Sequence, residues 1–272
     1  MKLEYHDGEV IELGFDDRLH SYRIEPDNEL IPSVTQTMDV ISKPGLIPWA
    51  LKEGVEWLSK NLFYDTERDN YHTKSVGIDF LTKGIKGAYR NTSTSAINIG
   101  TVTHQWVEGA IRWKLEGGDP PIMPPQKEAQ KAIEAFRAWV SENDVEWHSA
   151  ERKLYHRTHK YAGTVDAVAT INGEYCVIDW KTSKAVYPEY YLQVAAYAKA
   201  LENMDGVDVD SAYILRCDKK TGKFQCVQSE NFELDFDAFL AAQRLRRRVK
   251  VLSKKRKGGS LGRVVAHTIM DA

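Results

Sequence analysis

The fold is decided by the stretch Gly163-Thr-Val-Asp-Ala-Val-Ala-Thr-Ile171, Asn172-Gly173, Glu174-Tyr-Cys-Val-Ile-Asp-Trp-Lys181. Asn-Gly between two β-rich runs is the strongest short-range signal for a two-residue hairpin turn, because both turn positions need a positive φ. The turn residues add to 345 (172 + 173), so residue i pairs with residue 345 − i. This register places Asp166 directly opposite Asp179.

Two opposed carboxylates are unusual in a sheet, because their Cβ atoms lie only ~4.5–5.5 Å apart and their charges repel. A divalent cation that binds both sets of oxygen atoms would turn this repulsion into a binding site. Lys181 lies two residues after Asp179, so strand alternation places its ammonium group on the same face. Two acids and a lysine at one point indicate metal-assisted hydrolysis of a phosphodiester.

An Asp-x-Lys triplet alone is common on solvated strands, so the surrounding residues decide its meaning. Both faces of these strands are largely apolar, which is typical of a central strand that is covered on both sides. Unpaired burial of charge costs several kcal/mol, so buried charges in such a strand favour a functional role. One β-bulge would break the predicted register, although the two acids could still converge.

The composition describes a large globular chain. Its 272 residues are 42% hydrophobic and 28% charged, which fits one large domain or one domain with a sizeable elaboration. No apolar run approaches the length of a membrane span, and the N-terminus lacks a signal-peptide apolar region. The three cysteines have no paired metal spacing, and an odd number argues against a disulfide framework. We therefore expect a cytoplasmic protein without membrane association.

The net charge of −2 hides a strong asymmetry. Residues 244–257 hold nine cations and no acid, which leaves 28 basic and 39 acidic residues elsewhere, a balance of −11. A concentrated cationic stretch on an acidic body favours contact with a polyanion. The alternative is a solvated helix end. If the stretch binds nucleic acid, its candidate contact residues are Arg246, Arg247, Lys254 and Lys255.

A helix predicted over residues 98–116 carries a further candidate ligand. His104 and Glu108 lie one turn apart on a stripe that also contains Val107 and Ile111. A histidine on such a stripe is more often a hydrogen-bonded core residue than a ligand. If it points at the carboxylate pair, His104 becomes a nitrogen ligand that suits Mn²⁺ as well as Mg²⁺.

The remaining patterns fix the order of elements. Residues 1–95 are expected to form an N-terminal elaboration of short strands over 3–25 followed by helices, with Ser33 as an N-cap and a polar loop over 65–74. Its helices are predicted over 46–60 and 75–90. Residues 96–272 are expected to form the core, with helices over 126–142, 188–202 and 235–257 and strands over 145–155, 211–217 and 223–229. Together with the hairpin, this order predicts an α/β fold with a mixed sheet flanked by helices.

Five short motifs follow one another along the chain: Gly100-Thr-Val-Thr-His104, Glu151, Gly163-Thr-Val-Asp166, Asp179-Trp-Lys181 and Gln193-Val-Ala-Ala-Tyr197. Each motif is weak alone, but their order and spacing make the combination specific over about residues 98–217. Together they resemble the PD-(D/E)xK nuclease superfamily, in particular its RecB-type exonuclease branch with phage and mitochondrial genome-maintenance relatives. Scattered cysteines cannot supply the four-cysteine iron–sulfur cluster of some relatives, so the cluster-free branch fits better.

The resemblance implies a restriction-endonuclease-like core and a set of roles. One or two Mg²⁺ or Mn²⁺ ions would bind to Asp166, Asp179, His104 and the main-chain carbonyl of Trp180, with Glu108 as a weaker candidate. Glu151 would complete the shell through water, and Lys181 would hold and activate the attacking water. Gln193 and Tyr197 would position the phosphate or brace the site. For Tyr197, a purely structural role in the core is the alternative.

The expected function is therefore a metal-dependent deoxyribonuclease, an exonuclease acting on DNA with free ends in phage-type replication, recombination or repair. Its place would be the cytoplasm of a bacterial or phage-infected cell. Aromatic residues of the N-terminal part could stack on unpaired bases, and the basic helix could follow the backbone. The alternatives are a structure-selective endonuclease and a non-catalytic DNA-binding module on the same fold.

Overall fold

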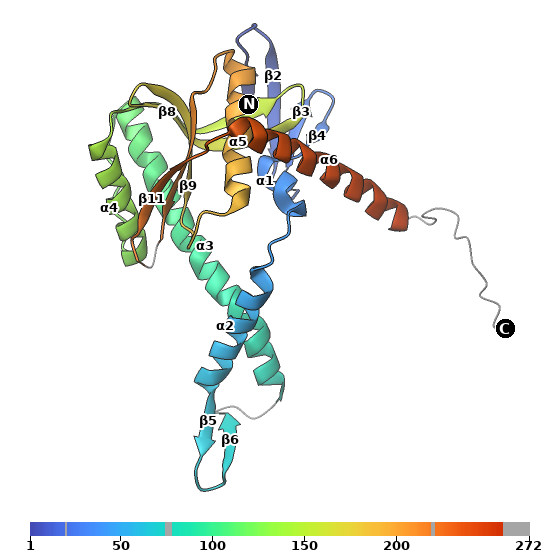
Figure 1. Cartoon of the computed structure of the whole chain (residues 1–272), viewed down its shortest axis with the longest axis vertical. Coiled ribbons are helices and arrows are strands. Elements are labelled where there is room, and N and C mark those ends of the chain that lie inside the picture. The colour runs from blue at the N-terminus through green and yellow to red at the C-terminus, as the bar shows by residue number, and fades with distance from the viewer. Residues whose placement is uncertain (20, 74–77, 219–220, 258–272) are drawn as a thin grey trace, which may run out of the picture.

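A five-stranded mixed sheet lies at the centre of the computed structural model, which describes residues 1–19, 21–73, 78–218 and 221–257 (Figure 1). Its strand order is β11-β10-β9-β8-β7, and β10 pairs parallel to β9 while the other neighbours are antiparallel. Helices cover both faces of this sheet, so the predicted fold class is confirmed. The strands are β7 (Val145–His156), β8 (Tyr161–Ile171), β9 (Glu174–Lys181), β10 (Ser211–Cys217) and β11 (Phe224–Gln228).

The β8–β9 hairpin has the predicted register. Ile171 pairs with Glu174 and Ala167 with Ile178, and the residue numbers of each pair add to 345. Asn172 and Gly173 have φ values of 51° and 91°, the positive values that the turn requires. The regular ladder ends at Ala167, one residue before the two acids, because the main-chain N–H of Trp180 donates to the Asp166 carboxylate instead.

Two apolar cores hold the helices on the sheet. The larger core contains α5 (Pro188–Asp205), the start of α6 (Phe232–Lys257) and one face of the strands, including Val168 and Val177. The smaller core packs α3 (Ile78–Glu116) and α4 (Lys127–Glu142) on the other face, through Val107, Ile111 and Phe136. Both faces of β8 and β9 are therefore covered, as their apolar sequence predicted.

The N-terminal strands form a separate four-stranded sheet in the order β1-β2-β3-β4, which shares the larger core through Leu13, Tyr22 and Ile31. The short helix α1 (Val34–Thr37) follows, and Ser33 accepts a hydrogen bond from the Gln36 N–H as its predicted N-cap. A 3₁₀ turn, η1 (Met38–Val40), ends this part. The strands are β1 (Lys2–Glu4), β2 (Val10–Asp16), β3 (Ser21–Glu25) and β4 (Glu29–Ile31).

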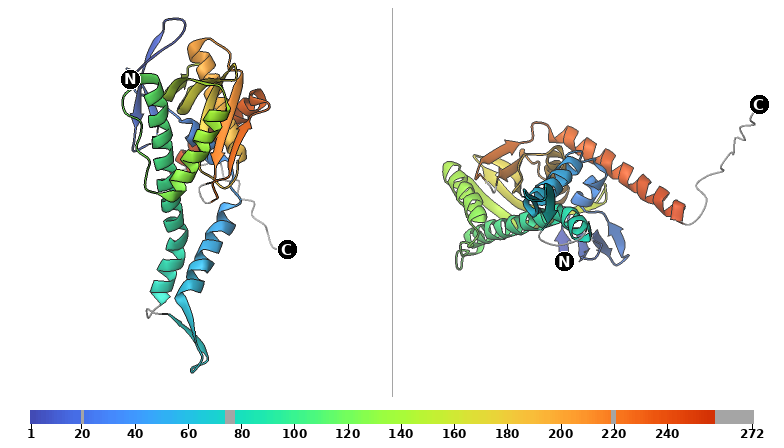
Figure 2. Two further views of the ribbon diagram at one scale, coloured as in Figure 1. Left: turned by 90° about the vertical axis from the view of Figure 1, so that its left-hand side faces the viewer. Right: turned by 90° about the horizontal axis from the view of Figure 1, so that it is seen from below.

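The helix α3 corrects the prediction of two helices over 75–90 and 98–116. It is one continuous helix of 39 residues, although residues 75–77 lie outside the described part of the chain. Only its second half packs on the sheet, and its first half lies against α2 (Leu46–Asn61) in an arm that projects from the body (Figures 1 and 2). The polar residues between the two halves suggested a break, but none of them is a proline, so the hydrogen-bond ladder continues.

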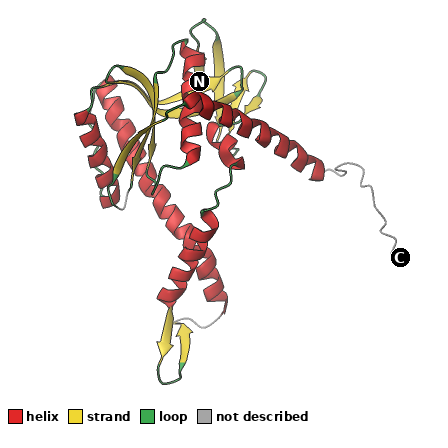
Figure 3. Cartoon of the chain, viewed as in Figure 1, coloured by secondary structure: helices red, strands yellow, loops and turns green. Residues whose placement is uncertain are grey.

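A hairpin occupies the end of this arm, where the sequence predicted a loop over 65–74. It consists of β5 (Leu62–Asp65) and β6 (Asn70–Thr73), seen as the two yellow strands below the helices in Figure 3. Tyr64 and Tyr71 face each other across it with ring centroids 5.1 Å apart, and both are largely exposed. A cross-strand aromatic pair stabilises such a hairpin. The polar residues of the turn indicated a loop instead.

Aromatic rings anchor the start of α6 to the sheet. His156, at the end of β7, is buried and stacks on Phe236 with ring centroids 5.9 Å apart. Burial, followed by the neighbouring His159, lowers the pKa of His156 to about 4. The histidine is therefore held neutral in the folded protein near neutral pH.

Among the described helices, none is long and apolar enough to cross a membrane.

This buried histidine predicts a pH dependence of stability. The unfolded chain takes up the proton at the ordinary pKa of 6.5 and the folded chain only at about 4, so the unfolded state binds more protons between these values. The free energy of unfolding should fall as the pH drops from 6.5 to 4, by less than about 3 kcal/mol at ~1.4 kcal/mol per unit of pKa shift. Urea titrations should show a smaller fall for His156→Phe, which keeps the ring stack. An identical fall in both proteins would contradict the prediction.

Candidate active site

Three neighbouring strands each bring one acid to the same region of the sheet. Glu151 lies on β7, Asp166 on β8 and Asp179 on β9. Ala150 pairs with Ala167 and Arg152 with Val165, which places Glu151 opposite Asp166 across the β7–β8 ladder. Asp166 is therefore the central acid, with one carboxylate on each side.

Glu151 has an unusual backbone that the sequence did not reveal. Its φ of 50° lies in the left-handed region, and the β7–β8 register shifts by one residue between Trp147 and Ser149. For a non-glycine residue this conformation costs energy of order 1–3 kcal/mol and is found most often at functional sites. The irregular strand brings Glu151 into the group of potential ligands.

His104, Glu151 and Asp166 form a group that can hold a metal ion. One potential ligand atom from each side chain lies within 4.8 Å of the other two, and all three residues are partly buried. The His104 Nδ1 lies 3.6 Å from the Asp166 Oδ2. The long helix α3 thus places His104 beside the central acid, the position that a ligand role would require.

The Asp166 carboxylate is held in its charged form. Burial alone would raise its pKa, but the His104 and Lys181 charges and a 2.6 Å hydrogen bond from the Trp180 N–H together lower it. The pKa of His104 is raised because the attraction of Asp166 and Asp179 outweighs its burial. A deprotonated carboxylate is the form that a divalent cation requires.

Asp179 pairs with Lys181 instead of joining the His104 group. Its carboxylate forms an ion pair with the Lys181 ammonium, and its side chain is only 2% exposed. Burial and the nearby Asp166 raise the pKa of Asp179 to about 6 despite this pairing. The two aspartates opposed in the sequence therefore differ in environment, one beside a histidine and the other beside a lysine.

Lys181 keeps its charge within this group, because attraction by Asp179 and Asp166 raises its pKa against the effect of burial. Its ammonium also lies over the Tyr190 ring, 5.0 Å from the centroid, on helix α5. Glu108, by contrast, accepts a 2.9 Å hydrogen bond from Arg112 and lies outside the His104 group. Burial, Asp166 and Glu108 together raise the pKa of Glu151 to about 7.

Gln193 and Tyr197 are linked to each other on α5. Both are buried, and the Gln193 side-chain N–H donates to the Tyr197 hydroxyl over 2.9 Å. Tyr197 packs so closely on β8 that a Cβ at Gly163 would lie 2.6 Å from its ring. The glycine of the Gly163–Asp166 motif is thus required by a close approach, and Tyr197 lies in the core.

A glycine also allows α3 to approach the sheet. A Cβ at Gly100 would lie 2.9 Å from the Thr182 hydroxyl, directly after Lys181. The glycine at the start of the Gly100–His104 motif therefore lets the helix pass the end of β9, one turn before His104. Two motifs that are far apart in the sequence meet through this contact.

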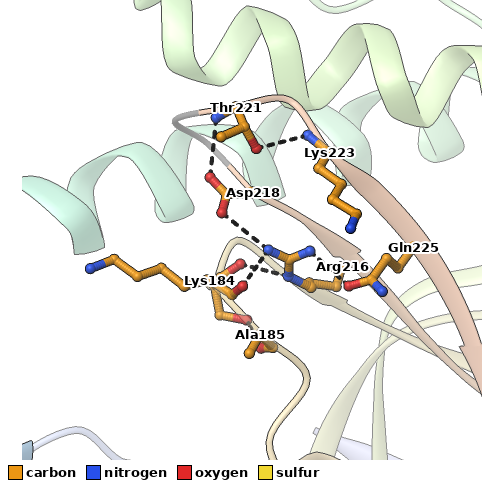
Figure 4. A network of polar contacts seen from close by, with 8 residues as sticks. Lys184, Ala185, Arg216, Asp218, Thr221, Lys223 and Gln225 are labelled. Carbon is orange, nitrogen blue, oxygen red and sulfur yellow. Dashed lines mark hydrogen bonds and ion pairs between the residues drawn. The ribbon is translucent and has the colours of Figure 1, made fainter.

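Arg216 is a buried residue near the site that sequence reasoning missed. It pairs with Lys181 in the parallel β9–β10 ladder and is 3% exposed. Figure 4 shows its guanidinium between the loop that follows Lys181 and the β10–β11 turn. It donates to the carbonyls of Ser183 at 2.8 Å and Lys184 at 2.5 Å, and to the side chains of Gln225 and Asp218. A lone arginine in an apolar strand gives no sequence signal of these partners.

Arg216 is expected to control the loop after Lys181. Arg216→Lys keeps the charge but lacks the planar fork that reaches four acceptors, so the loop should loosen. Small misplacements at a reacting centre lower reaction rates by up to ~10²-fold. We therefore expect the turnover of a reaction at the neighbouring acids to fall by 10-fold or more, with less change in KM. Turnover and KM measured at a temperature where the variant stays folded would check this. Equal turnover would show that the network serves stability alone.

The basic residues of α6 have mixed surroundings. Arg246 donates to the Gln36 side chain at 3.2 Å, and Arg247 donates to the His159 carbonyl at 3.0 Å. Lys254 and Lys255 lie in the last turn of the helix, but their side chains are outside the described part of the structure. Figure 2 shows this end of α6 extending away from the body. The role of these residues in binding nucleic acid stays a prediction.

Comparison with profiles of known protein families gives no match. Among curated proteins, human mitochondrial genome maintenance exonuclease 1 is 36% identical over 73 residues, which cover 25% of this chain and 20% of that protein. The mouse protein of the same name is 41% identical over 59 residues, 20% of this chain and 18% of its own. The match therefore spans about a fifth of these relatives.

Two solved structures of the alkaline exonuclease LHK-Exo from Laribacter hongkongensis are also similar. The complex with dAMP has a TM-score of 0.33 at 15% identity and covers 58% of this chain and 85% of its own. The other has a TM-score of 0.30 at 16% identity, with 57% and 84% covered. These scores are too low to support a conclusion. What the comparisons show is a short match to the mitochondrial genome maintenance exonucleases, in a chain whose motifs resemble those of PD-(D/E)xK exonucleases.

Proposed function

We propose that the protein is a metal-dependent nuclease that hydrolyses the phosphodiester bonds of DNA from free ends. The observation that carries this proposal is the His104–Glu151–Asp166 group beside the Asp179–Lys181 ion pair. Two carboxylates and an imidazole offer ligands for a divalent cation, and a charged lysine next to them suits a reaction in which negative charge develops.

The donor set fits a divalent cation. Ligand atoms around one Mg²⁺ lie about 2.0–2.1 Å from the ion, so opposite ligands are roughly 4.2 Å apart. The 4.8 Å limit within the group is close to this value, and small side-chain rotations would close the difference. Such an ion would polarise the scissile phosphate and favour deprotonation of the attacking water. Mg²⁺ and Mn²⁺ are the candidates, with His104, Asp166 and Glu151 as ligands and with Asp179 and the Trp180 carbonyl completing the shell.

The residues of this chain would share the remaining work. Lys181 would hold the attacking water and offset the charge that develops on the phosphate. Asp179 keeps the Lys181 ammonium in place through their ion pair. Gln193 and Tyr197 would position these groups from α5, since their hydrogen bond and close packing fix them against β8.

The N-terminal residues 1–95 would guide the substrate to this site. The arm of α2 and the first half of α3 presents exposed tyrosines, Tyr64 and Tyr71, at its far end. Aromatic rings stack on unpaired bases, and each such contact is worth about 1–3 kcal/mol. In this proposal, residues 96–272 form the nuclease core, and α6 supplies the basic surface.

The rival functions differ in what they require. A non-catalytic DNA-binding module needs neither the acids nor the lysine, whereas this chain retains all of them at one point of the sheet. A structure-selective endonuclease would use the same site as an exonuclease, so the choice of DNA substrate decides between exonuclease and endonuclease. Linear and circular DNA, single- and double-stranded, should be incubated with the protein in Mg²⁺, Mn²⁺ or a chelator.

The expected result is loss of linear DNA in the presence of either metal, with circular DNA intact and no reaction in the chelator. Labels at the 5′ and 3′ ends would give the direction of digestion. Cleavage of circular DNA would favour the endonuclease, and binding without cleavage under all conditions would favour the non-catalytic module.

The role of His104 can be tested by the choice of metal. Mg²⁺ binds nitrogen and oxygen sites more weakly than Mn²⁺ does, so loss of one ligand should harm the Mg²⁺ reaction more. For His104→Ala we expect a larger fall in activity with Mg²⁺ than with Mn²⁺, measured below the melting temperature of the variant. Equal falls with both metals would mean that His104 contributes only to the packing of α3.

A further inference from the structure

A small polar pocket lies between α6 and the β7–β8 turn, apart from the His104 group. Its volume is about 150 Å³. The turn contributes one wall and the first half of α6 the other, so both walls belong to elements that are packed on the sheet. The lining residues are Thr158, His159 and Lys160 from the turn and Leu240, Gln243, Arg244 and Arg247 from the helix.

The chemistry of this pocket favours an anion. Lys160, Arg244 and Arg247 bring three positively charged side chains to the pocket. Arg244 and Arg247 lie three residues apart on α6, so they share one face of the helix. Thr158 adds a hydroxyl group. Burial and these two arginines lower the pKa of His159, which is the effect of a positive field in the pocket.

Some of these charges already have partners in the pocket walls. Lys160 forms an ion pair with Glu29, which is exposed, and Arg247 donates one N–H group to the His159 carbonyl over 3.0 Å. Gln243 donates to the same carbonyl. A guanidinium group has five N–H donors, so Arg247 is oriented by its contact and still has donors for a ligand. The pocket is therefore a preformed arrangement of donors.

We propose that this pocket binds one phosphate group of a DNA strand whose end lies in the His104 site. The proposal rests on the nuclease function proposed above. The planar fork of a guanidinium group matches the geometry of phosphate oxygens better than the point charge of a lysine does. A volume of 150 Å³ equals that of roughly five waters at ~30 Å³ each, which is enough for a phosphate group and its remaining hydration.

The distance between the two sites fits a strand that spans both. Lys160 immediately precedes β8, and Asp166 lies six residues further along the chain. At ~3.3 Å per residue, the strand separates them by roughly 20 Å. A stacked strand advances about 3.4 Å per nucleotide along its axis, so the pocket would hold a phosphate at most about six nucleotides from the reacting bond.

The test compares two double variants of the full chain that each remove two positive charges from α6. Arg244→Gln/Arg247→Gln changes the pocket, and Arg248→Gln/Lys250→Gln changes exposed residues outside its lining. Binding of a fluorescent single-stranded oligonucleotide is measured in chelator at several salt concentrations. This measurement needs no cleavage, so it remains informative if the nuclease proposal fails.

We expect the pocket variant to bind at least 10-fold more weakly and to lower the slope of log K against log salt by ~0.7 for the lost phosphate contact. The control variant should change both quantities less. Lys160→Gln, on the opposite wall, should repeat the effect of the pocket variant, which guards against an error from misfolding of α6. Equal losses in the two double variants would overturn the proposal, because general attraction would then explain the binding.

A free anion could use the same chemistry, so inorganic phosphate provides a further arm. Calorimetric titration of the wild-type chain with phosphate, together with competition against the oligonucleotide, distinguishes the sources. If phosphate binds in the pocket but the pocket variant binds the oligonucleotide normally, the pocket serves a free anion and the proposal is wrong. If phosphate competes only weakly while the pocket variant strongly weakens oligonucleotide binding, the result supports a pocket that binds a DNA strand.

Discussion

Replacing Lys181 by methionine is expected to lower the turnover of DNA cleavage by about 10²–10³-fold, the usual effect of removing one group that stabilises developing charge. Methionine keeps an unbranched side chain of similar shape but lacks the Nζ that lies over the Tyr190 ring, so the change removes the ammonium together with this ring contact. Binding of DNA and of metal should change much less. Single-turnover cleavage assays with saturating metal would measure the effect.

The matched control for this variant is Lys184→Met, three residues further along the chain. The Lys184 side chain is exposed and points away from the Arg216 network in Figure 4, while its main-chain carbonyl keeps its hydrogen bond. The double variant Asp179→Asn/Lys181→Met avoids an unpaired buried carboxylate and should be equally inactive. Turnover within threefold of the wild type in both Lys181 variants would remove this residue from the mechanism.

The sequence predicted the centre of the site because short-range rules govern it. Asn172-Gly173 determines the hairpin register, and the register determines which face Asp166, Asp179 and Lys181 share. Local patterns also predicted the α4 and α5 helices and the mixed sheet. In each case the relevant interactions lie within one turn or one hairpin, where hydrophobic periodicity and turn chemistry are strong signals.

The parts that were missed depend on contacts between distant segments. Arg216 bonds to the loop after Lys181. Glu151 was assigned to the site from the sequence, but its positive φ follows no residue pattern. The prediction of two helices over 75–90 and 98–116 missed the continuity of α3, whose first half packs against α2 in the arm. The sequence predicted that the opposed acids bind one ion together, which stays a prediction. The structure adds that their surroundings differ, because Lys181 forms its ion pair with Asp179.

This asymmetry makes Asp166 the residue on which metal binding should depend most. It is the only acid of the described residues that contacts both His104 and the Trp180 N–H, and it belongs to the metal-capable group. Asp166→Asn keeps the shape of the side chain and an oxygen to accept from Trp180. It removes the charge that attracts a divalent cation.

We expect Asp166→Asn to weaken binding of Mn²⁺ by at least ~100-fold, above the 10–100-fold typical of residues that only support a ligand. Calorimetric titration would measure this in the absence of DNA. Thermal unfolding gives a second readout, because an ion at 100 times its Kd stabilises the folded wild type by about 2.7 kcal/mol. The variant should gain almost none of this stabilisation at the same concentration.

Asp208→Asn is the control, since it removes the same charge from an exposed loop outside the metal-capable group. Its Mn²⁺ affinity should equal that of the wild type. If Asp166→Asn retained the wild-type affinity while Asp179→Asn lost it, the cation would belong beside Lys181 and the His104 group would have another role. If both variants lost affinity to the same degree, the two acids would share the ion, as their opposed positions in the hairpin first indicated.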